Sequence, residues 1–415
     1  MQIKTENADI LWAVISRSFV ASIIVVAACG PATTDAGAHG VGTGTDTIPQ
    51  AISSVVAASH TCALTVAGAA YCWGYTVEQP GGTDRLVVTP TPVQAPNGGA
   101  ITFQSLSVSK VEDVTCAVAT TGAAYCWGEN DHGQLGDGTT TPHAAPTLVA
   151  GGLTFKSIAV GDAHVCGVTT SGSLYCWGFS ANGAFGDGSV GEHRTPTPSA
   201  AGLTFQTVVA GSDFSCGLTT AGSAYCWGLG NNGQLGDGNG RTNRSPVAVT
   251  GDQRFESIVG DGQGACGLTD AGKAYCWGSD FFGTVGDGSS ATTDGVIRRV
   301  APTVVAGDLT FATLAAGYLT VCGITGSGAG YCWGANDGAI GDGSLEQRSS
   351  PVGVSGGLTF RSISSGTGYS CGITTSSALY CWGDNSGGGL GDGTTVSRPA
   401  PVPISWPRTA EGNAR

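Results

Sequence analysis

Short apolar runs separated by glycine, proline and asparagine fill the chain from about residue 50 to residue 406. Typical runs are Phe155–Gly161, His164–Thr169 and Leu174–Gly178. Because no stretch of this region has the 3.6-residue period of an amphipathic helix, the runs predict β-strands, about four in each repeating unit. The fourth contains a Pro-x-x-Val segment such as Pro246–Val249. Proline cannot donate a hydrogen bond inside a sheet, so we place this strand at the outer edge.

The tetrapeptide Tyr-Cys-Trp-Gly recurs seven times and gives the chain its period. Its copies begin at Tyr71, Tyr125, Tyr175, Tyr225, Tyr275, Tyr331 and Tyr380, which are 54, 50, 50, 50, 56 and 49 residues apart. A period of this size is typical of solenoids, propellers and arrays. Seven four-stranded sheets in succession predict an all-β fold, a seven-bladed β-propeller of four-stranded antiparallel blades. The pattern leaves open whether the last strand pairs with the first blade to close the ring.

A second cysteine precedes each tetrapeptide cysteine by ten residues, so fourteen of the fifteen cysteines form pairs. A three-residue hairpin turn between them places the two cysteines opposite each other, with a left-handed glycine, or Ser377 in the last copy, closing the turn. Opposed cysteines on antiparallel strands are close enough for a disulfide, so we expect disulfides rather than free thiols or a metal site. The pairs are Cys62 and Cys72, Cys116 and Cys126, Cys166 and Cys176, Cys216 and Cys226, Cys266 and Cys276, Cys322 and Cys332, and Cys371 and Cys381.

The beginning of the chain resembles the leader of a bacterial lipoprotein. Lys4 and Arg17 precede the apolar run Phe19–Ala28, which ends in Val-Ala-Ala-Cys, a sequence similar to a lipobox. We expect a signal peptide over residues 1–28, a lipidated Cys29 with a flexible tether over 29–49, the propeller over 50–406 and a disordered tail over 407–415. A plain secretory signal is the alternative. Either leader exports the chain to an oxidising place, the cell envelope or outer surface, which the paired cysteines also require.

The repeat as a whole resembles that of the RCC1 (regulator of chromosome condensation) family. The shared pattern is His-x-Cys-x-Leu-Thr, a turn glycine, Tyr-x-Trp-Gly, Asn-x-x-Gly-Gln-Leu-Gly and then proline, over residues from about 51 to 406. The resemblance implies a seven-bladed propeller. Members of the family include a nucleotide-exchange factor for a nuclear GTPase and a plant photoreceptor, and a bacterial relative of the fold inhibits β-lactamase. A shared fold therefore does not settle the function.

Composition excludes some classes of function. Charged residues make up 11% of the chain and the net charge is −13, which argues against nucleic acid or an anionic membrane as the main ligand. A glycine-rich loop carries one aspartate in each of six repeats, and one carboxylate per loop is too few for calcium, so we expect turn capping. These are Asp137, Asp187, Asp237, Asp287, Asp342 and Asp392. The tetrapeptide tryptophans are expected in the core between blades, and each tyrosine ring over the glycine or alanine opposite it.

No catalytic cluster and no cofactor motif emerges from the sequence. We expect His60 and His164, at the repeat's own histidine position, to bond backbone groups. His132, His143 and His193 fall in predicted loops with no serine or cysteine nucleophile beside them.

The seven copies differ most in the loop that precedes the first cysteine of each pair. Because equivalent loops gather on one rim of a propeller, we interpret them as a recognition surface with exposed aromatic and acidic side chains; drift in unconstrained loops is the alternative. The candidate binding residues are His60, Glu112, Asp113, Asp162, His164, Asp213, Phe214, Gln263, Tyr318 and Tyr369. A second variable set follows the tryptophan-glycine pair: Tyr75, Glu129, Phe179, Phe281 and Phe282.

The sequence therefore favours a monomeric, surface-tethered, non-enzymatic scaffold that binds a protein or glycan partner through one rim. An enzyme acting on polysaccharide, a lyase or hydrolase with acidic rim residues such as Asp162 and Asp213, is the alternative. Nucleotide exchange on a GTPase, which the family resemblance suggests, is disfavoured because an exported, disulfide-bonded protein is separated from cytosolic GTPases.

Overall fold

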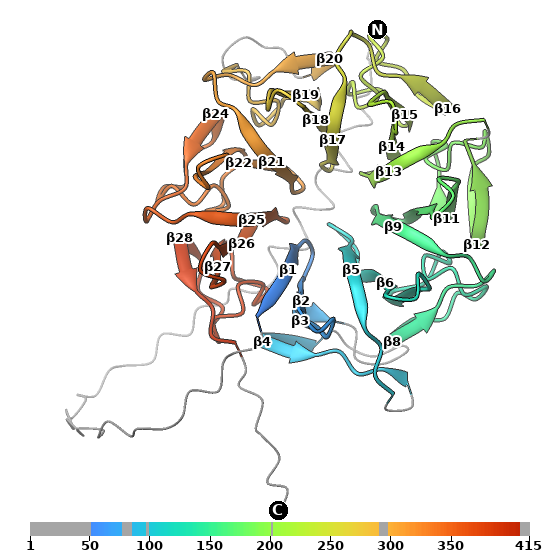
Figure 1. Cartoon of the computed structure of the whole chain (residues 1–415), viewed down its shortest axis with the longest axis horizontal. Coiled ribbons are helices and arrows are strands. Elements are labelled where there is room, and N and C mark those ends of the chain that lie inside the picture. Colours follow the sequence, from blue (N-terminus) through green and yellow to red (C-terminus); the bar gives the residue numbers. More distant parts are fainter. Residues whose placement is uncertain (1–50, 77–84, 97–98, 201, 290–297, 407–415) are drawn as a thin grey trace, which may run out of the picture. The chain divides into compact units, whose positions relative to one another are not determined.

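The computed structural model describes residues 51–76, 85–96, 99–200, 202–289 and 298–406. They form seven four-stranded antiparallel sheets arranged as the blades of a β-propeller (Figure 1), which confirms the predicted fold class. No helix among these residues is long and apolar enough to cross a membrane. The expected signal peptide, lipidated Cys29, tether and C-terminal tail lie outside the described residues.

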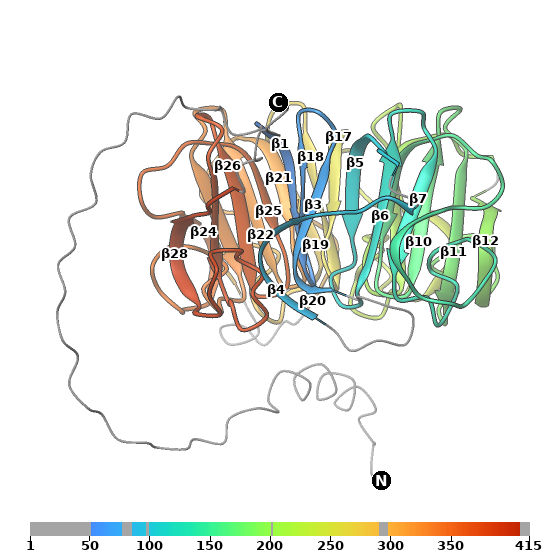
Figure 2. The same cartoon turned by 90° about the horizontal axis from the view of Figure 1, so that it is seen from below.

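The four strands of each blade follow one another in sequence from the centre of the ring to its edge (Figures 1 and 2). The innermost strands are β1 (Ile52–Ala57), β5 (Phe103–Val108), β9 (Phe155–Val160), β13 (Phe205–Ala210), β17 (Phe255–Gly260), β21 (Phe311–Ala316) and β25 (Phe360–Ser365). The second strands are β2 (Thr61–Thr65), β6 (Val114–Ala119), β10 (His164–Thr169), β14 (Phe214–Thr219), β18 (Gly264–Thr269), β22 (Thr320–Thr325) and β26 (Tyr369–Thr374).

The two outer strands of each blade hold the tetrapeptide and the proline segment. The third strands are β3 (Ala70–Thr76), β7 (Ala124–Gly128), β11 (Leu174–Ser180), β15 (Ala224–Gly228), β19 (Ala274–Ser279), β23 (Gly330–Gly334) and β27 (Leu379–Gly383). The fourth are β4 (Arg85–Pro92), β8 (His143–Leu148), β12 (Gly191–Ser199), β16 (Asn243–Ala248), β20 (Arg298–Val304), β24 (Arg348–Gly353) and β28 (Arg398–Pro403). The proline strand is therefore outermost, as predicted.

The hairpin between the second and third strands has the predicted register. Cys166 lies opposite Cys176 and Gly167 opposite Tyr175, and the other blades repeat this pairing. All seven expected disulfides are formed, with Cα–Cα distances of 4.0–4.1 Å. Ser377 closes the last turn with a φ of 68°, the left-handed conformation that glycine adopts in the other copies.

In the five blades with a glycine opposite the tyrosine, the glycine makes room for a phenylalanine ring and not for the tyrosine ring, so the expectation was wrong for these copies. A Cβ on Gly167 would lie 2.6 Å from the ring of Phe155, the first residue of the neighbouring strand β9, and not against Tyr175. Gly217, Gly267, Gly323 and Gly372 face the corresponding phenylalanine in the same way. The small residue therefore makes room for a buried ring from the inner strand, which sequence spacing within the hairpin did not reveal.

The core lies between neighbouring blades, and the tetrapeptide tryptophans join each blade to the one before it, as expected. The Trp177 indole N–H donates to the Gln134 carbonyl of the preceding blade at 2.8 Å. Gly136 follows in that loop at a φ of 67°, and a Cβ there would lie 2.7 Å from the Trp177 ring nitrogen. The Gly-Gln-Leu-Gly loop is thus shaped to receive an indole, and Trp73, Trp227, Trp277, Trp333 and Trp382 repeat the contact.

The loop aspartates cap their own turns, as predicted. Asp137 accepts hydrogen bonds from the backbone N–H and the hydroxyl of Thr139, both at 2.8 Å. The same contact recurs at Asp187, Asp237, Asp287, Asp342 and Asp392. His143 and His193 lie in strands β8 and β12, not in loops, where each faces its turn aspartate. In later blades an arginine takes that place, as in the Arg348–Asp342 pair at 2.7 Å.

The ring is closed without an interleaved strand in the part of the chain that the structure describes. Blades one and seven are each built from four consecutive strands. Packing joins them: the Tyr369 hydroxyl lies 2.8 Å from Thr61 Oγ1, and the Trp73 N–H donates to Gly389 O at 2.9 Å. The ring of Trp406, after the last strand, packs against that of Tyr71 of the first blade, with ring centroids 4.8 Å apart and the planes tilted by 58°. The question that the sequence left open is therefore settled in favour of closure by side-chain packing.

Candidate functional site

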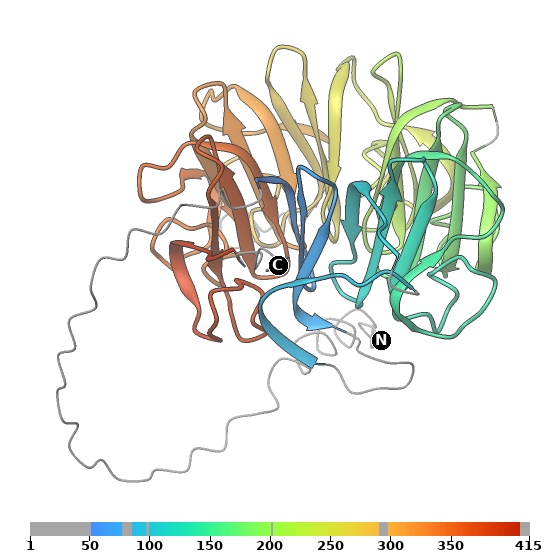
Figure 3. The same cartoon turned by 60° about the horizontal axis from the view of Figure 1, so that its bottom comes forward.

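Both variable loop sets lie on one face of the propeller. The first and third strands of a blade run in the same direction, so the loops that follow them emerge together. Backbone hydrogen bonds join the two loops within a blade, as between Phe179 N–H and Ala163 O at 2.8 Å and between Glu129 N–H and Asp113 O at 2.9 Å. The loops after the innermost strands surround one end of the central channel, on the side of the ring that is turned away from the viewer in Figure 3, and we name this surface the mouth face. They are Ala58–His60, Ser109–Asp113, Gly161–Ala163, Gly211–Asp213, Asp261–Gln263, Gly317–Leu319 and Gly366–Gly368.

Neighbouring mouth loops are linked to each other around most of the ring. Ser212 N–H donates to Gly262 O and Gly262 N–H to Tyr318 O, both at 3.0 Å, while Tyr318 N–H donates to Gly366 O at 3.2 Å. Thr367 and Ser59 continue the circuit to Ala58 O and Ser109 O. The mouth is consequently a continuous backbone rim over five of the seven seams.

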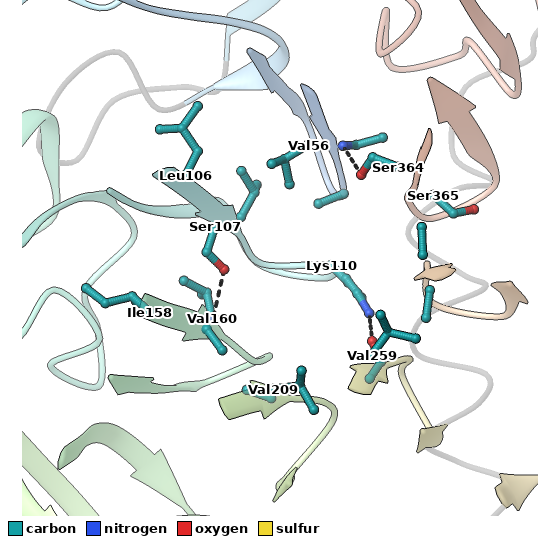
Figure 4. A pocket seen from close by; sticks show the side chains of 18 of the residues that line it. Val56, Leu106, Ser107, Lys110, Ile158, Val160, Val209, Val259, Ser364 and Ser365 are labelled. Atoms are coloured by element: carbon teal, nitrogen blue, oxygen red, sulfur yellow. Dashed lines mark hydrogen bonds between the residues drawn. The ribbon is translucent and has the colours of Figure 1, made fainter. Parts of the chain in front are cut away.

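Lys110 closes the mouth from one side. Its loop is longer than the others: seven residues lie between Val108 and Cys116, whereas five lie between Val160 and Cys166. The extra length lets the Lys110 side chain extend over the channel, where its ammonium group donates to the Gly260 carbonyl at the end of β17 (Figure 4). The Thr367 hydroxyl donates to the Lys110 carbonyl at 2.5 Å. Blades two, five and seven therefore meet at one residue, Lys110.

Burial perturbs the ionisable groups around this amine. Burial lowers the pKa of Lys110 to about 8, against the opposing attraction of Asp261 and Asp162. The side chain keeps some accessible surface because it faces the channel, but protein surrounds its amine. Burial likewise raises the pKa of Asp162 and of Asp261, each to about 6, although the Lys110 charge opposes both shifts. Asp261 also accepts a hydrogen bond from Gln263 N–H at 2.7 Å.

Four of the predicted rim residues are not exposed. The structure buries His60, His164, Phe214 and Tyr369, with at most 4% of each residue accessible. Phe214 and Tyr369 pack between blades, where a ring excludes more water than it would at a loop tip. The expectation of exposed aromatic side chains was therefore wrong for these two.

The histidines at the repeat position bond side chains, not the backbone as expected. His60 Nε2 lies 2.7 Å from Thr115 Oγ1 of the next blade, and its Nδ1 lies 2.9 Å from Asp113. His164 Nε2 lies 2.9 Å from Ser215 Oγ, and burial lowers its pKa to about 4 against the attraction of Asp213. Both imidazole rings therefore connect neighbouring blades. Because burial disfavours the charged form, His164 is neutral in this position.

The other predicted rim residues remain at the surface of the mouth face. Glu112, Asp113, Asp162, Asp213, Gln263 and Tyr318 are partly exposed. Gln134 donates to Glu112 at 2.8 Å, yet burial raises the pKa of that carboxyl. Asp213, at a φ of 55°, accepts a hydrogen bond from Ser180 at 3.0 Å. In the second set, Tyr75 and Phe281 are each 48% exposed, and Phe179 stacks on His132 at 5.0 Å.

The mouth face is acidic at its centre. In the seven mouth loops, all of them within the described residues, Lys110 is the one lysine or arginine among several carboxylates. Asp131, Asp337 and Asp384 add negative charge from the loops that follow β7, β23 and β27. Arginines stand further out, where Arg299, Arg348 and Arg398 pair with turn aspartates. A cationic surface would therefore find its complement around the channel and not at the edge.

Sequence reasoning missed Lys110 and Asp261. Asp261 stands where most copies carry the repeat glycine. The two positions are equivalent, since the Asp261 N–H donates to Gly264 O just as the Gly161 N–H donates to His164 O. The signals available were this replaced glycine and the longer loop before Cys116. The contact across the channel was not available, because it depends on the closed ring.

The chain matches the RCC1-like domain over residues 106–413. It belongs to the RCC1-like domain family. The E3 ubiquitin-protein ligase HERC2 of Homo sapiens and that of Mus musculus are each 36% identical to it over 112 residues. That segment is 26% of this chain and 2% of either ligase, so the chain spans a small fraction of these relatives.

Several solved structures share its fold. Prp20p of Saccharomyces cerevisiae superimposes with a TM-score of 0.71 at 20% identity, over 84% of this chain and 88% of that protein. Human WBSCR16 gives 0.69 at 19% identity, over 81% and 90%. The ectodomain of the Arabidopsis thaliana receptor kinase ACR4 gives 0.52 at 18% identity, over 86% and 99%. At these identities the likeness establishes the fold alone.

Proposed function

We propose that this RCC1-like propeller is an exported, non-enzymatic scaffold that binds a protein with a basic surface through the mouth face. The seven disulfides point to an oxidising, extracellular environment. Tethering through a lipidated Cys29 belongs to the same proposal. Among the solved relatives, Prp20p binds Gsp1p and histones and has been crystallised with Kap60, so propellers of this fold serve protein recognition.

The observation that carries the proposal is the coincidence of variability and charge on one face. The blades repeat each other in their hairpins and tryptophan seams, whereas both variable loop sets emerge around the channel mouth. Exposed or partly exposed acids at Asp131, Asp337 and Asp384, with the aromatic rings of Tyr75 and Phe281, give this face the mixed acidic and aromatic character of a recognition surface.

A charge-reduced variant tests the proposal. Asp131→Asn, Asp337→Asn and Asp384→Asn together remove three charges from the mouth face while preserving side-chain shape. The matched control, Asp252→Asn, Asp270→Asn and Asp308→Asn, removes three charges from exposed positions near the starts of inner strands and in a hairpin turn, on the opposite face. Each full chain, also carrying Cys29→Ser, serves as bait for the extracellular and envelope proteins of its source cells.

We expect one protein to be retained by the wild type and the control and to be lost, by about tenfold or more, from the mouth-face variant. Raising the salt concentration should weaken its capture, since the contacts are between charges near the surface. Equal capture by all three baits, or loss from the control alone, would contradict the proposal. A retained polysaccharide in place of a protein would do so as well.

A second candidate function, polysaccharide cleavage, is favoured by one observation. Asp162 and Asp261 both have a pKa of about 6, and both flank Lys110 at the mouth, so a proton donor and a proton acceptor are available near neutral pH. Asp213, the other carboxylate named for this role, is held by Ser180 and Asn182. A glycan that is depolymerised by the wild type and not by Asp162→Asn would establish this activity in place of the scaffold.

A further inference from the structure

The central channel contains a nucleophile in an apolar chamber. The chamber has a volume of about 280 Å³ and is lined by the ends of the innermost strands of all seven blades. Most of its wall is aliphatic, for example Val56, Leu106, Ile158 and Val259 (Figure 4). Lys110 is the one lysine in the lining, and its amine stands at the end of the chamber nearest the mouth.

The polar wall groups are already engaged, so few of them compete for a guest. The Ala57 N–H donates to Ser364 Oγ at 2.9 Å and the Val160 N–H donates to Ser107 Oγ at 3.0 Å, which ties neighbouring inner strands together. Ser365 shares a hydrogen bond with Ser370 at 2.8 Å. The Lys110 amine is consequently the reactive group that a small molecule in this chamber would meet.

We propose that the channel binds a small apolar aldehyde and holds it as an imine on the Lys110 amine. The neutral amine attacks the carbonyl carbon, forming a C–N bond, and the carbonyl oxygen becomes the hydroxyl of a carbinolamine. Loss of one amine proton and of that hydroxyl as water leaves the C=N bond. No oxidant or reductant is required, and one water is released for each aldehyde bound.

Three features of the site favour this chemistry. Desolvation favours the neutral, nucleophilic form of a lysine in an apolar chamber, and its pKa of about 8 leaves a substantial neutral share at pH 7.5. Asp162 and Asp261, each with a pKa of about 6, interact electrostatically with Lys110 and can exchange a proton near neutral pH. Tyr318 and Ser212 beside Asp162 complete the polar end of the site.

The same features define the ligand. The aliphatic wall suits an alkyl chain of a few carbons, given the chamber volume. The carboxyls of Asp162 and Asp261 disfavour an anionic aldehyde, because its charge would lie beside theirs. Butanal is therefore the preferred probe, and glyoxylate, which is smaller but anionic, is its counterpart.

Lysine is scarce in this chain, which makes the test unambiguous. The sequence has four lysines, Lys4, Lys110, Lys156 and Lys273, and the last two lie on the opposite face, so each modified lysine can be assigned by peptide mapping. The folded full chain would be incubated with butanal and cyanoborohydride at pH 7.5, which reduces an imine to a stable secondary amine. The rate of butyl addition at each lysine is then compared within the same molecule.

We expect Lys110 to be modified at least about tenfold faster than Lys156 and Lys273 in the folded protein, because the Lys110 amine has a lowered pKa and lines the apolar chamber, whereas the other two side chains are exposed to water. Glyoxylate should show no such preference, and unfolding in urea should abolish it. Lys110→Arg keeps the cation and should remove the fast reaction, whereas Lys156→Arg should leave it unchanged. Equal rates at the three lysines, or no modification of Lys110 in the folded wild type when the unfolded chain reacts, would overturn the proposal. The comparison within the wild type holds even if Lys110→Arg fails to fold.

Discussion

Buried carboxyls at the channel mouth should make the folded state more stable in mild acid than at neutral pH. The folded pKa of Asp162 is raised from 3.8 to about 6, so between these values the folded state binds the extra proton. Stability therefore falls as pH rises through this window. Lys110 acts in the opposite sense at higher pH: its folded pKa of about 8 lies below 10.5, so stability rises as pH increases between these values.

Asp162→Asn tests the expected contribution of Asp162 to the pH dependence of stability. At pH 7.5 the substitution removes a partly desolvated charge, and we expect the free energy of unfolding to increase by about 1–2 kcal/mol, less the lost attraction to Lys110. At pH 4.5 the wild-type carboxyl is protonated in the folded state, so the difference should largely vanish. Urea denaturation at both pH values measures it.

Asp308→Asn is the control for this experiment, because Asp308 is exposed and asparagine tolerates its φ of 49°. It should change stability little at either pH. A wild type that is more stable than Asp162→Asn at pH 7.5 would show that the Lys110–Asp162 attraction outweighs desolvation, and the expected direction of the pH dependence would then be wrong.

The glycines in the loops that receive the tetrapeptide tryptophans can be tested one at a time for their contribution to packing. Gly186 and Gly188 share one loop and have similar φ angles of 80° and 88°. A Cβ at Gly186 would lie 2.7 Å from the Trp227 ring nitrogen, whereas a Cβ at Gly188 meets nothing within 4 Å. Alanine at either position has the same left-handed strain, so the difference between the two variants isolates the packing of the indole.

We expect Gly188→Ala to lower the free energy of unfolding by about 1–2 kcal/mol and Gly186→Ala by about 3 kcal/mol or more. Denaturant unfolding followed by tryptophan fluorescence reports both the stability and the environment of the seam. Equal losses in the two variants would mean that the loop relaxes away from Trp227, and the close fit would not be needed for stability.

At the scale of the element, each disulfide among the described residues links the second and third strands of a single blade, and none of them joins two blades. Replacing Cys166 and Cys176 together by alanine opens one disulfide that closes a short loop, and we expect a loss of about 2–3 kcal/mol. Thermal or denaturant unfolding measures the loss. Thiol titration of the unfolded full chain carrying Cys29→Ser should find no free thiol, since the other 14 cysteines are in disulfides. A stability equal to that of the wild type would indicate that this pair is not bonded in solution.

Elements defined by local spacing were predictable from the sequence, and those defined between repeats were not. The Cys166–Cys176 register follows from the hairpin turn, and the outer strand follows from proline chemistry. By contrast, the Phe155 ring that fills the space above Gly167 comes from another strand, and the Gln134 carbonyl that receives Trp177 comes from another blade. Periodicity shows that blades repeat, but it does not show which side chain of one repeat enters the next.

The candidate site was likewise predictable only in part. The variable loops could be placed on one rim because equivalent positions of a propeller share a face. Their exposure could not be predicted, since Phe214 and Tyr369 look like recognition residues in the sequence and yet fill seams between blades. The role of Lys110 could not be predicted for a related reason. Its partners, Gly260 and Asp261, are about 150 residues away in the sequence and come near Lys110 only when the ring closes.

At the scale of the whole molecule, the seam between blades seven and one is joined by packing and hydrogen bonds without a shared strand. Tyr369 is central to it, since its buried hydroxyl lies 2.8 Å from Thr61 Oγ1 and 3.4 Å from the Ala58 nitrogen. Burial raises the pKa of Tyr369 to about 12, so this hydroxyl stays neutral over the ordinary pH range. Its hydrogen bonds therefore contribute to closure at any pH at which the protein folds.

Tyr369→Phe retains the buried ring and removes only these hydrogen bonds, leaving Thr61 with its bond to Gly389 O at 2.7 Å. We expect the free energy of unfolding to fall by about 1–2 kcal/mol. Hydrogen exchange should quicken in β1 and β26 before it does in β13 and β14, on the far side of the ring. Among the described residues, the seam between blades seven and one is the one seam that no chain connection crosses, so it should open first. Tyr225→Phe, a partly exposed tyrosine in blade four, is the control and should alter neither quantity appreciably. Faster exchange spread evenly over all seven blades would show that the ring unfolds as a single unit and that this seam is no weaker than the other six.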